Sequence, residues 1–464
     1  MNSDKVKKIG LISSVILAVI LFFCLYYINI TKINSEDGQA LEAPKTINAS
    51  SRFVENKSIY SDYNSGEITK AYITVFPTTD KAGNCNDFSS FNLLANWNDE
   101  ENPLLDANIQ FVKGDKEFVE YQARTANSTI RVRGDRSNPL KSYRVKLMEG
   151  IKSLGGQAVF NIDKNSGDPS RIANKLAHDI IIDIDNISGF RTNFLKIYIK
   201  DGSLDTDERI FNSYGLYTHT EQPNKTYLRS RGLDDKGSLY YAENFRFQLA
   251  PELKSRDDDD YDKQSFETVL RIREGKEHTK LLRMLEDIND ESKDFKTVFN
   301  TYFNEENYLT WLGINVLLGN SGAISNGFLI YNPSNSSVWY FMPWDFDGIF
   351  KWMEDDTEDY PSFIEQMGDV VLHKRYMEEE GSLDKLKDKI DQLIRGPFSK
   401  KNVKRIRKSY KPILYEIMNQ YPDNVLSDFS LNEYFTYIDL IDERILINHE
   451  EFVEFYENKS LDGR

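Results

Sequence analysis

Residues 319–347 read GNSGAISNGFLIYNPSNSSVWYFMPWDFD, and the rest of the chain is best interpreted outward from them. A short polar loop precedes two apolar runs separated by Asn, Pro and Ser, which is the pattern of a β-hairpin. The second run ends in Asp345, Phe346 and Asp347. Because residues i and i+2 point to one side of a strand, we expect the two carboxylates to converge on one hard cation. Asn326 opens the strand that leads to them.

The chain changes from strand-rich to helix-rich around an acidic run at 257–260. Short runs of β-branched and aromatic residues between 71 and about 161 predict a twisted antiparallel sheet, and residues 169–184 have the periodicity of a helix. Most segments after the acidic run are helical by periodicity. We therefore predict an α+β protein with a strand-rich part at 71–255 and a mainly helical part at 256–464 that carries the hairpin.

The N-terminus predicts a membrane anchor. Residues 11–30 form 20 residues without a charge, enough for a helix to span a hydrocarbon core of about 30 Å. Lys5, Lys7 and Lys8 precede them and place residues 1–10 in the cytoplasm. A cleaved signal peptide is the alternative, but its apolar core is usually shorter, and no small-residue cleavage site follows here. We expect a single-pass protein of the cell membrane, with a polar linker at 31–70 and an extracytoplasmic folded part.

Charge and cysteine content exclude several classes of function. The formal net charge is −16, and because residues 1–30 carry +2, the remaining chain carries −18. This balance argues against nucleic acid as a partner. Cys85 is the only cysteine outside the apolar run, so the folded part can form neither an intrachain disulfide nor a thiolate metal site.

Four separated blocks of the sequence carry a family resemblance. They are RVRGDRSNPLKSYRVKL at 131–147, FN at 160–161 with DPSRIANKL at 168–176, GLYTHTE at 215–221, and PWDFD at 343–347. In this order they resemble the motifs of the spore coat protein H (CotH) kinase family. The resemblance implies a two-lobed protein-kinase-like fold, with a strand-rich N-lobe and a helical C-lobe after the transmembrane helix.

The resemblance also implies ATP as a cofactor together with Mg²⁺ or Mn²⁺. Asp345 matches the metal-binding aspartate that bridges the ion to the phosphates, with Asn326 as the second protein ligand. Asp347 is either a further ligand or a cap for the turn at Gly348, and we favour the ligand.

A kinase-like site also needs groups that hold the nucleotide. The resemblance implies Lys146, with Lys141 as second choice, as the cation for the triphosphate. Arg131 and Arg133 lie on one face of the preceding strand, where they can reach phosphate oxygens. Glu221 falls where the family resemblance places the connection between the lobes that cradles the adenine.

One departure from kinase-like sites concerns proton transfer. Such sites carry an aspartate shortly before the metal-binding asparagine, and family members show Asp near the positions held here by Asn320 and Ser321. Between Leu318 and Tyr331 this sequence has no carboxylate. An Asn amide cannot accept the proton of the acceptor hydroxyl, and a base of this kind contributes roughly 10²–10⁴-fold to the rate.

Three functional classes follow. The first is an ATP-dependent kinase that acts on Ser or Thr of surface or spore-coat proteins. The second is a catalytically impaired pseudokinase that serves as a nucleotide-binding or assembly module at the cell envelope. The third is a carbohydrate- or wall-binding domain, suggested by Trp339, Trp344 and Trp352.

Overall fold

The computed structural model describes most of the chain after residue 52, and these residues belong to one compact unit. They are 53–61, 68–79, 83–93, 103–114, 116–122, 124–134, 141–151, 155–204, 210–350, 363–427 and 429–462. The predicted membrane span at 11–30 lies outside them, as does most of the predicted linker. Within the described ranges, no helix has the length and apolar character needed to cross a membrane.

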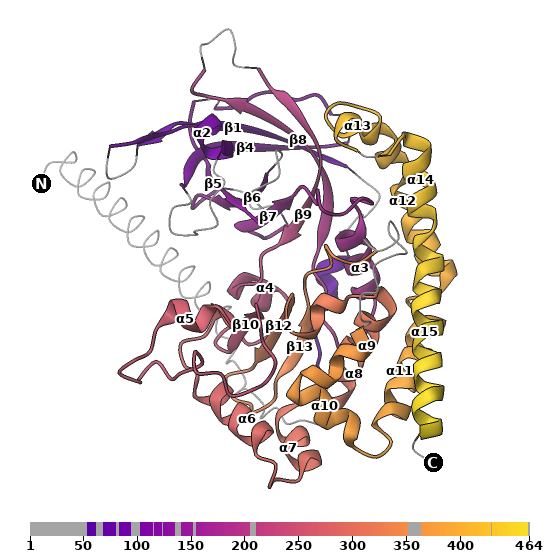
Figure 1. The fold of residues 1–464 in the computed structure, drawn as a ribbon. Helices are drawn as coiled ribbons and strands as arrows, with labels where there is room; N and C mark the ends of the chain where they lie inside the picture. The colour runs from indigo at the N-terminus through magenta and orange to yellow at the C-terminus, as the bar shows by residue number, and fades with distance from the viewer. Residues whose placement is uncertain are drawn as a thin grey trace, which may run out of the picture. The chain divides into compact units, whose positions relative to one another are not determined.

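Seven strands form a closed barrel (Figure 1). Around the barrel they follow the order β1 (Thr69–Phe76), β4 (Leu105–Lys113), β5 (Ser128–Arg133), β6 (Ser142–Leu147), β7 (Val159–Asp163), β9 (Asn212–Glu221) and β8 (Thr192–Asp201). The pairs from β1 to β7 are antiparallel, as the sequence predicts for this stretch. The closing pair of β1 and β8 is parallel and joins strands far apart in the chain.

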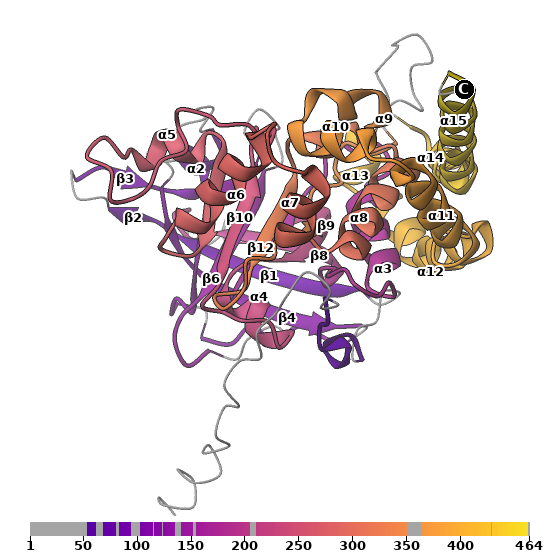
Figure 2. The same cartoon turned by 90° about the horizontal axis from the view of Figure 1, so that it is seen from below.

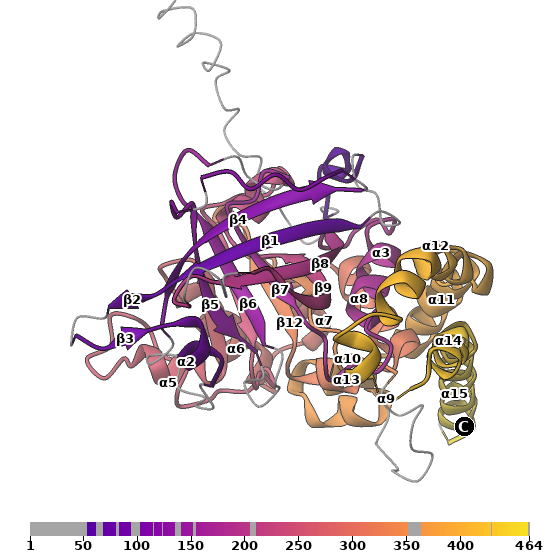
Figure 3. The ribbon, with the colours of Figure 1, turned by 90° about the horizontal axis from the view of Figure 1, so that it is seen from above.

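Side chains on the barrel strands alternate between two environments. Ile130 and Val132 of β5 and Tyr143 and Val145 of β6 are buried in the core of the barrel. The residues between them point to the other face, where the two strands carry arginines. Figure 3, seen from above, shows β1 and β4 running along this barrel, with the C-terminal helices to one side.

Several short elements lie between or after the barrel strands in the chain. They are the hairpin of β2 (Thr78–Thr79) and β3 (Cys85–Asn86), α2 (Phe88–Leu93), α3 (Ala173–Ile181) and α4 (Lys225–Ser230). The helix predicted within 169–184 is thus confirmed as α3, all of whose residues are buried.

A second sheet holds the hairpin that the sequence singles out. Its antiparallel order is β11 (Leu270–Glu274), β10 (Ser238–Ala242), β12 (Phe328–Asn332) and β13 (Tyr340–Pro343). The hairpin prediction is confirmed, with Phe328 opposite Pro343. The boundary predicted between residues 255 and 256 falls between β10 and β11, two neighbouring strands of this one sheet. Figure 2, seen from below, shows helices α6 and α7 beside it.

Helices make up most of the remaining described chain. They are α5 (Lys263–Glu267), α6 (Thr279–Asn289), α7 (Phe295–Tyr302), α8 (Glu305–Leu318), α9 (Phe363–Gln366), α10 (Val371–Glu378), α11 (Ser382–Arg395), α12 (Lys400–Met418), α13 (Asp423–Leu426), α14 (Leu431–Asp439) and α15 (Ile441–Asp462). Helix α8 is buried from Asn307 to Leu318, and it ends at Gly319, whose φ of 61° suits glycine. This helix leads into the polar loop before β12.

The α+β class is confirmed, but the expected clean division into two lobes is not. The N-terminal strands close into a barrel, and four strands form a second sheet among the helices of the later part. The pattern of single strands does not reveal this, because the closing pair and the second sheet both join residues distant in sequence.

Candidate functional site

Asp345 and Asp347 lie in the loop after β13, beyond the last strand residue, Pro343. Phe346 between them is fully buried, whereas both aspartates are half-buried. The backbone of Asp345 is held at both ends: its N–H donates to the carbonyl of Gly327 at 2.9 Å, and its carbonyl accepts from Nδ2 of Asn320 at 3.1 Å. The loop that carries the two aspartates is therefore braced. Because it lies beyond the last residue of β13, the convergence of the two carboxylates on one cation stays a prediction.

The polar loop before β12 approaches Asp345 closely. Gly327 has a φ of +72°, and a Cβ there would lie 3.1 Å from the Cβ of Asp345, so glycine suits this position. Asn326 is exposed, and its Oδ1 accepts a hydrogen bond from the hydroxyl of Tyr241 at 3.3 Å. Burial, and then the carboxylates of Asp345 and Glu243, raise the pKa of Tyr241. The side chains of Asn326, Tyr241 and Asp345 therefore lie near one another.

The donor set fits a hard cation. Asp345 and Asp347 offer carboxylate oxygens, and Asn326 offers an amide oxygen, which are the ligands that Mg²⁺ and Mn²⁺ prefer. Across the described residues, no group of three or more His, Cys, Asp or Glu is placed to hold a metal ion. A cation at this position would therefore depend on Asn326 and on oxygens supplied by a phosphate ligand.

Asn320 reaches the site through the backbone. Its Nδ2 donates to Oδ1 of Asn315 and to the carbonyl of Asp345, both at 3.1 Å, and its side chain is buried. The amide thus ties the end of α8 to the loop that carries the aspartates.

The outer face of β5 and β6 carries three arginines. Arg131 lies directly opposite Arg144 in the strand register. Arg144 donates from Nε to Oδ1 of Asn161 on β7 at 3.2 Å, and Arg133 forms an ion pair with Asp163 at the end of β7. The two arginines predicted from the sequence are therefore joined by a third from the neighbouring strand.

Arg133 of the barrel lies near the aspartates after β13. Burial lowers the pKa of Arg133, while the nearby carboxylates of Asp347 and Asp345 oppose that shift. Such an electrostatic interaction requires the end of β5 to lie close to the aspartate loop. The site is thus built between the barrel and the second sheet.

Two further arginines come from β11, which sequence reasoning missed. Arg271 forms an ion pair with Glu243 at 2.6 Å, and the guanidinium of Arg273 lies 5.2 Å from the ring centre of Tyr241. A signal was present, since β11 repeats the Arg-x-Arg pattern of β5. Without the fold, nothing brings these two strands together.

Five arginines therefore occupy one region, and we call them the arginine cluster: Arg131, Arg133, Arg144, Arg271 and Arg273. Burial, followed by repulsion from the other four, lowers the pKa of Arg144 to about 8. Burial and the neighbouring Arg271 lower the pKa of Arg273 to about 10. The region is consequently rich in positive charge that its surroundings only partly neutralise.

The two predicted lysines take different places. Lys146 lies on the same face of β6 as Arg144, opposite Thr129, and is exposed. Lys141 is buried just before β6, and its carbonyl accepts from the hydroxyl of Tyr217 at 3.1 Å. Both Arg144 and Lys146 lie on β6, where the sequence predicts the cation that binds the triphosphate, and Arg144 is the less exposed of the two.

Glu221 is occupied by structural partners. It is buried, and its Oε1 lies 2.5 Å from Nη2 of Arg191, while its Oε2 lies 2.5 Å from Nη2 of Arg231. Arg231 also meets Glu55 at 3.2 Å. The structure therefore presents Glu221 to two arginines, and its predicted contact with adenine stays a prediction.

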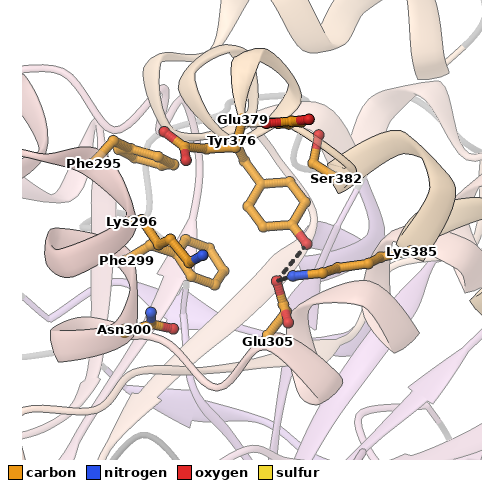
Figure 4. A pocket seen from close by; sticks show the side chains of 10 residues that line it. Phe295, Lys296, Phe299, Asn300, Glu305, Tyr376, Glu379, Ser382 and Lys385 are labelled. Atoms are coloured by element: carbon orange, nitrogen blue, oxygen red, sulfur yellow. Dashed lines mark hydrogen bonds and ion pairs between the residues drawn. The ribbon is translucent and has the colours of Figure 1, made fainter.

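A separate pocket lies among the helices (Figure 4). Phe295, Phe299 and Tyr376 form part of its wall, and its volume is about 150 Å³. The hydroxyl of Tyr376 and Nζ of Lys385 both contact Oε1 of Glu305, at 2.9 and 2.8 Å. None of the residues predicted from the sequence lines this pocket.

The class of this protein follows from its sequence match. The model of the CotH kinase protein family matches residues 130–440, more than half of the sequence, and the chain belongs to this family. No curated protein matches the sequence. The crystal structure of the Helicobacter pylori proinflammatory kinase CtkA aligns with a TM-score of 0.32 and 12% identity, covering 67% of this chain and 94% of that one.

Proposed function

We propose that this chain is a membrane-anchored, extracytoplasmic kinase that transfers phosphate from ATP to Ser or Thr of a surface or spore-coat protein. Family membership supports the reaction class. The observation that carries the proposal for the site is the close approach of the loop of Asn326 and Gly327 to Asp345, which brings together an amide and a carboxylate suited to a divalent cation.

Each part of the site has a role in this proposal. Asp345, Asp347 and Asn326 would hold Mg²⁺ or Mn²⁺, which would supply positive charge to neutralise the phosphates. Arg131 and Arg133 bind phosphate oxygens. The acceptor oxygen bonds to the γ-phosphorus as the bond from phosphorus to the bridging oxygen breaks, and ADP leaves with the electron pair. The hydroxyl proton passes to water, since the loop around Asn320 offers no carboxylate.

A second candidate function is a nucleotide-binding pseudokinase at the cell envelope. The specific observation in its favour is Asn320, whose amide donates to Asn315 and Asp345 and cannot act as a base. A loss of roughly 10²–10⁴-fold in rate is the expected cost of a missing base. Because phosphoryl transfer is largely dissociative, positioning and the metal ion still sustain slow turnover in the first proposal.

The location outside the cytoplasm rests on the sequence of residues 1–30. The apolar run and the three lysines before it support a single N-terminal anchor. Protease treatment of intact cells tests this, since an extracytoplasmic domain is digested and a cytoplasmic one is protected.

Nucleotide binding tests the site. The purified full-length chain in detergent is heated with ATP and Mg²⁺ or Mn²⁺, beside Asp345→Ala and the exposed control Asp388→Ala. A ligand at 100 times its Kd stabilises the fold by about 2.7 kcal/mol. Stabilisation of wild type and control but not of Asp345→Ala supports the site, and transfer of labelled phosphate then separates kinase from pseudokinase. No response over the millimolar range contradicts both.

A further inference from the structure

The arginine cluster contains hydrogen-bond donors that the described residues leave unused. Nε of Arg144 donates a hydrogen bond to Oδ1 of Asn161. Nδ2 of the same amide is buried without a hydrogen-bond partner within the described chain. Nε of Arg273 is likewise buried without a hydrogen-bond partner among the described residues. A buried donor without an acceptor is costly, so each of these atoms calls for an acceptor that the described residues do not supply.

The charges of the cluster point to the same kind of ligand. Arg133 is paired with Asp163, and Arg271 with Glu243. For the other three, Arg131, Arg144 and Arg273, the described part of the chain contains no ion pair. A group with several negative oxygens would satisfy both the spare donors and the uncompensated charge, and a guanidinium binds such oxygens through two parallel hydrogen bonds.

The position of the cluster connects this ligand with the aspartates. Arg144 and Asn161 belong to neighbouring barrel strands, whereas Arg273 belongs to the second sheet. The carboxylate of Asp345 lies close enough to Arg133 to affect the pKa of that guanidinium. An anion held by both sheets would therefore lie next to the carboxylates that suit a divalent cation.

We propose that Arg144, Asn161 and Arg273 bind the phosphate chain of the nucleotide, with one guanidinium supplied by the barrel and one by the second sheet. The assignment gives to these residues the role that the sequence gave to Lys146. It rests on the proposed function only in taking the anion to come from a nucleotide. An inorganic phosphate chain would use the same donors, and the experiment separates the two sources.

Calorimetric titration of the full-length chain tests the proposal with two probes, inorganic tripolyphosphate without metal and ATP with Mg²⁺. The variants are Arg144→Gln, Arg273→Gln and Arg144→Lys, the last of which keeps the charge but loses the planar fork. Arg405→Gln, at an exposed arginine on α12, is the matched control, and Lys146→Gln tests the rival residue. The melting temperature of each variant without ligand shows whether it is folded.

We expect Arg144→Gln and Arg273→Gln each to weaken binding of both probes by about tenfold or more, with a smaller loss for Arg144→Lys. The controls should stay within about twofold, a difference of no more than about 0.4 kcal/mol. Unchanged binding of both probes by the two glutamine variants overturns the proposal while leaving the nucleotide site intact. Binding of tripolyphosphate but not of ATP by wild type leaves the phosphate site standing and contradicts the kinase function.

Discussion

Two groups of arginines in this protein are neutralised in different ways. The first, which we call the paired network, consists of Arg191 and Arg231 with Glu221 and Glu55. Arg231 is fully buried there and meets a carboxylate on each side, at 2.5 and 3.2 Å. The arginine cluster by contrast holds five arginines, of which two have a carboxylate partner among the described residues.

This difference separates a structural role from a binding role. A buried charge that is matched within the fold fixes the packing around it, and removing its partner leaves an uncompensated charge. A group of charges that the fold leaves unmatched is unfavourable until an anion binds. Mutations in the two groups should therefore have opposite patterns of effect on stability and on ligand binding.

The largest expected effect is on the paired network. Glu221→Gln should lower the free energy of unfolding by about 3 kcal/mol, because it leaves Arg231 buried with Glu55 as its remaining carboxylate. Urea denaturation at pH 7 measures this, with the exposed Glu291→Gln as control. A change below about 1 kcal/mol would show that the network does not hold the fold together.

Ionisation of Glu221 makes the free energy of unfolding depend on pH. Burial opposes ionisation of Glu221, but Arg231 and Arg191 outweigh it and lower its pKa from 4.5 to about 2. Its stabilisation is therefore complete above pH 4.5 and is lost as the pH falls from 4.5 towards 2, by at most about 1.4 kcal/mol per pH unit. The stability difference between wild type and Glu221→Gln should narrow over that range. An unchanged difference at pH 7, 4.5 and 3 would contradict the assignment.

The arginine cluster should respond in the opposite way. Without ligand, Arg144→Gln should change the free energy of unfolding by less than about 1 kcal/mol, because losing the bond to Asn161 is offset by relief of repulsion from the other arginines. Added sulfate should raise the melting temperature of wild type more than that of the variant. If the variant is strongly destabilised and sulfate has equal effects, the cluster is structural.

The smallest effect is expected at Lys146. This exposed side chain should be replaceable by Gln with a change in stability within about 0.5 kcal/mol. The affinity of the Lys146→Gln variant for ATP should stay within about twofold of that of wild type. A tenfold loss of affinity would instead restore the lysine to the phosphate-binding role that the sequence alone suggested.

Local features of the site were predictable from the sequence. The hairpin of β12 and β13 depends on residues within a short stretch, where strand periodicity and turn chemistry decide the structure. Arg131 and Arg133 were found for the same reason, because alternation along one strand places them on one face.

Long-range features were not predictable in the same way. Arg271 and Arg273 lie far along the chain from Arg131, and only the second sheet brings them near the barrel. Glu221 resembled a ligand-binding residue by its block of sequence, yet its surroundings include Glu55, from a segment before the first barrel strand. Burial and charge pairing of this kind depend on the whole fold.

The central claim is that a cation and a phosphate chain bind side by side at Asp345 and the arginine cluster. Titration of ATP into the full-length chain, with Mg²⁺ and then with a chelator, tests it most directly when repeated for Asp345→Ala. We predict that Mg²⁺ strengthens ATP binding by at least about tenfold in wild type and that Asp345→Ala removes this difference. Equal affinity with metal and with chelator in wild type, or an unchanged metal effect in the variant, would contradict the account.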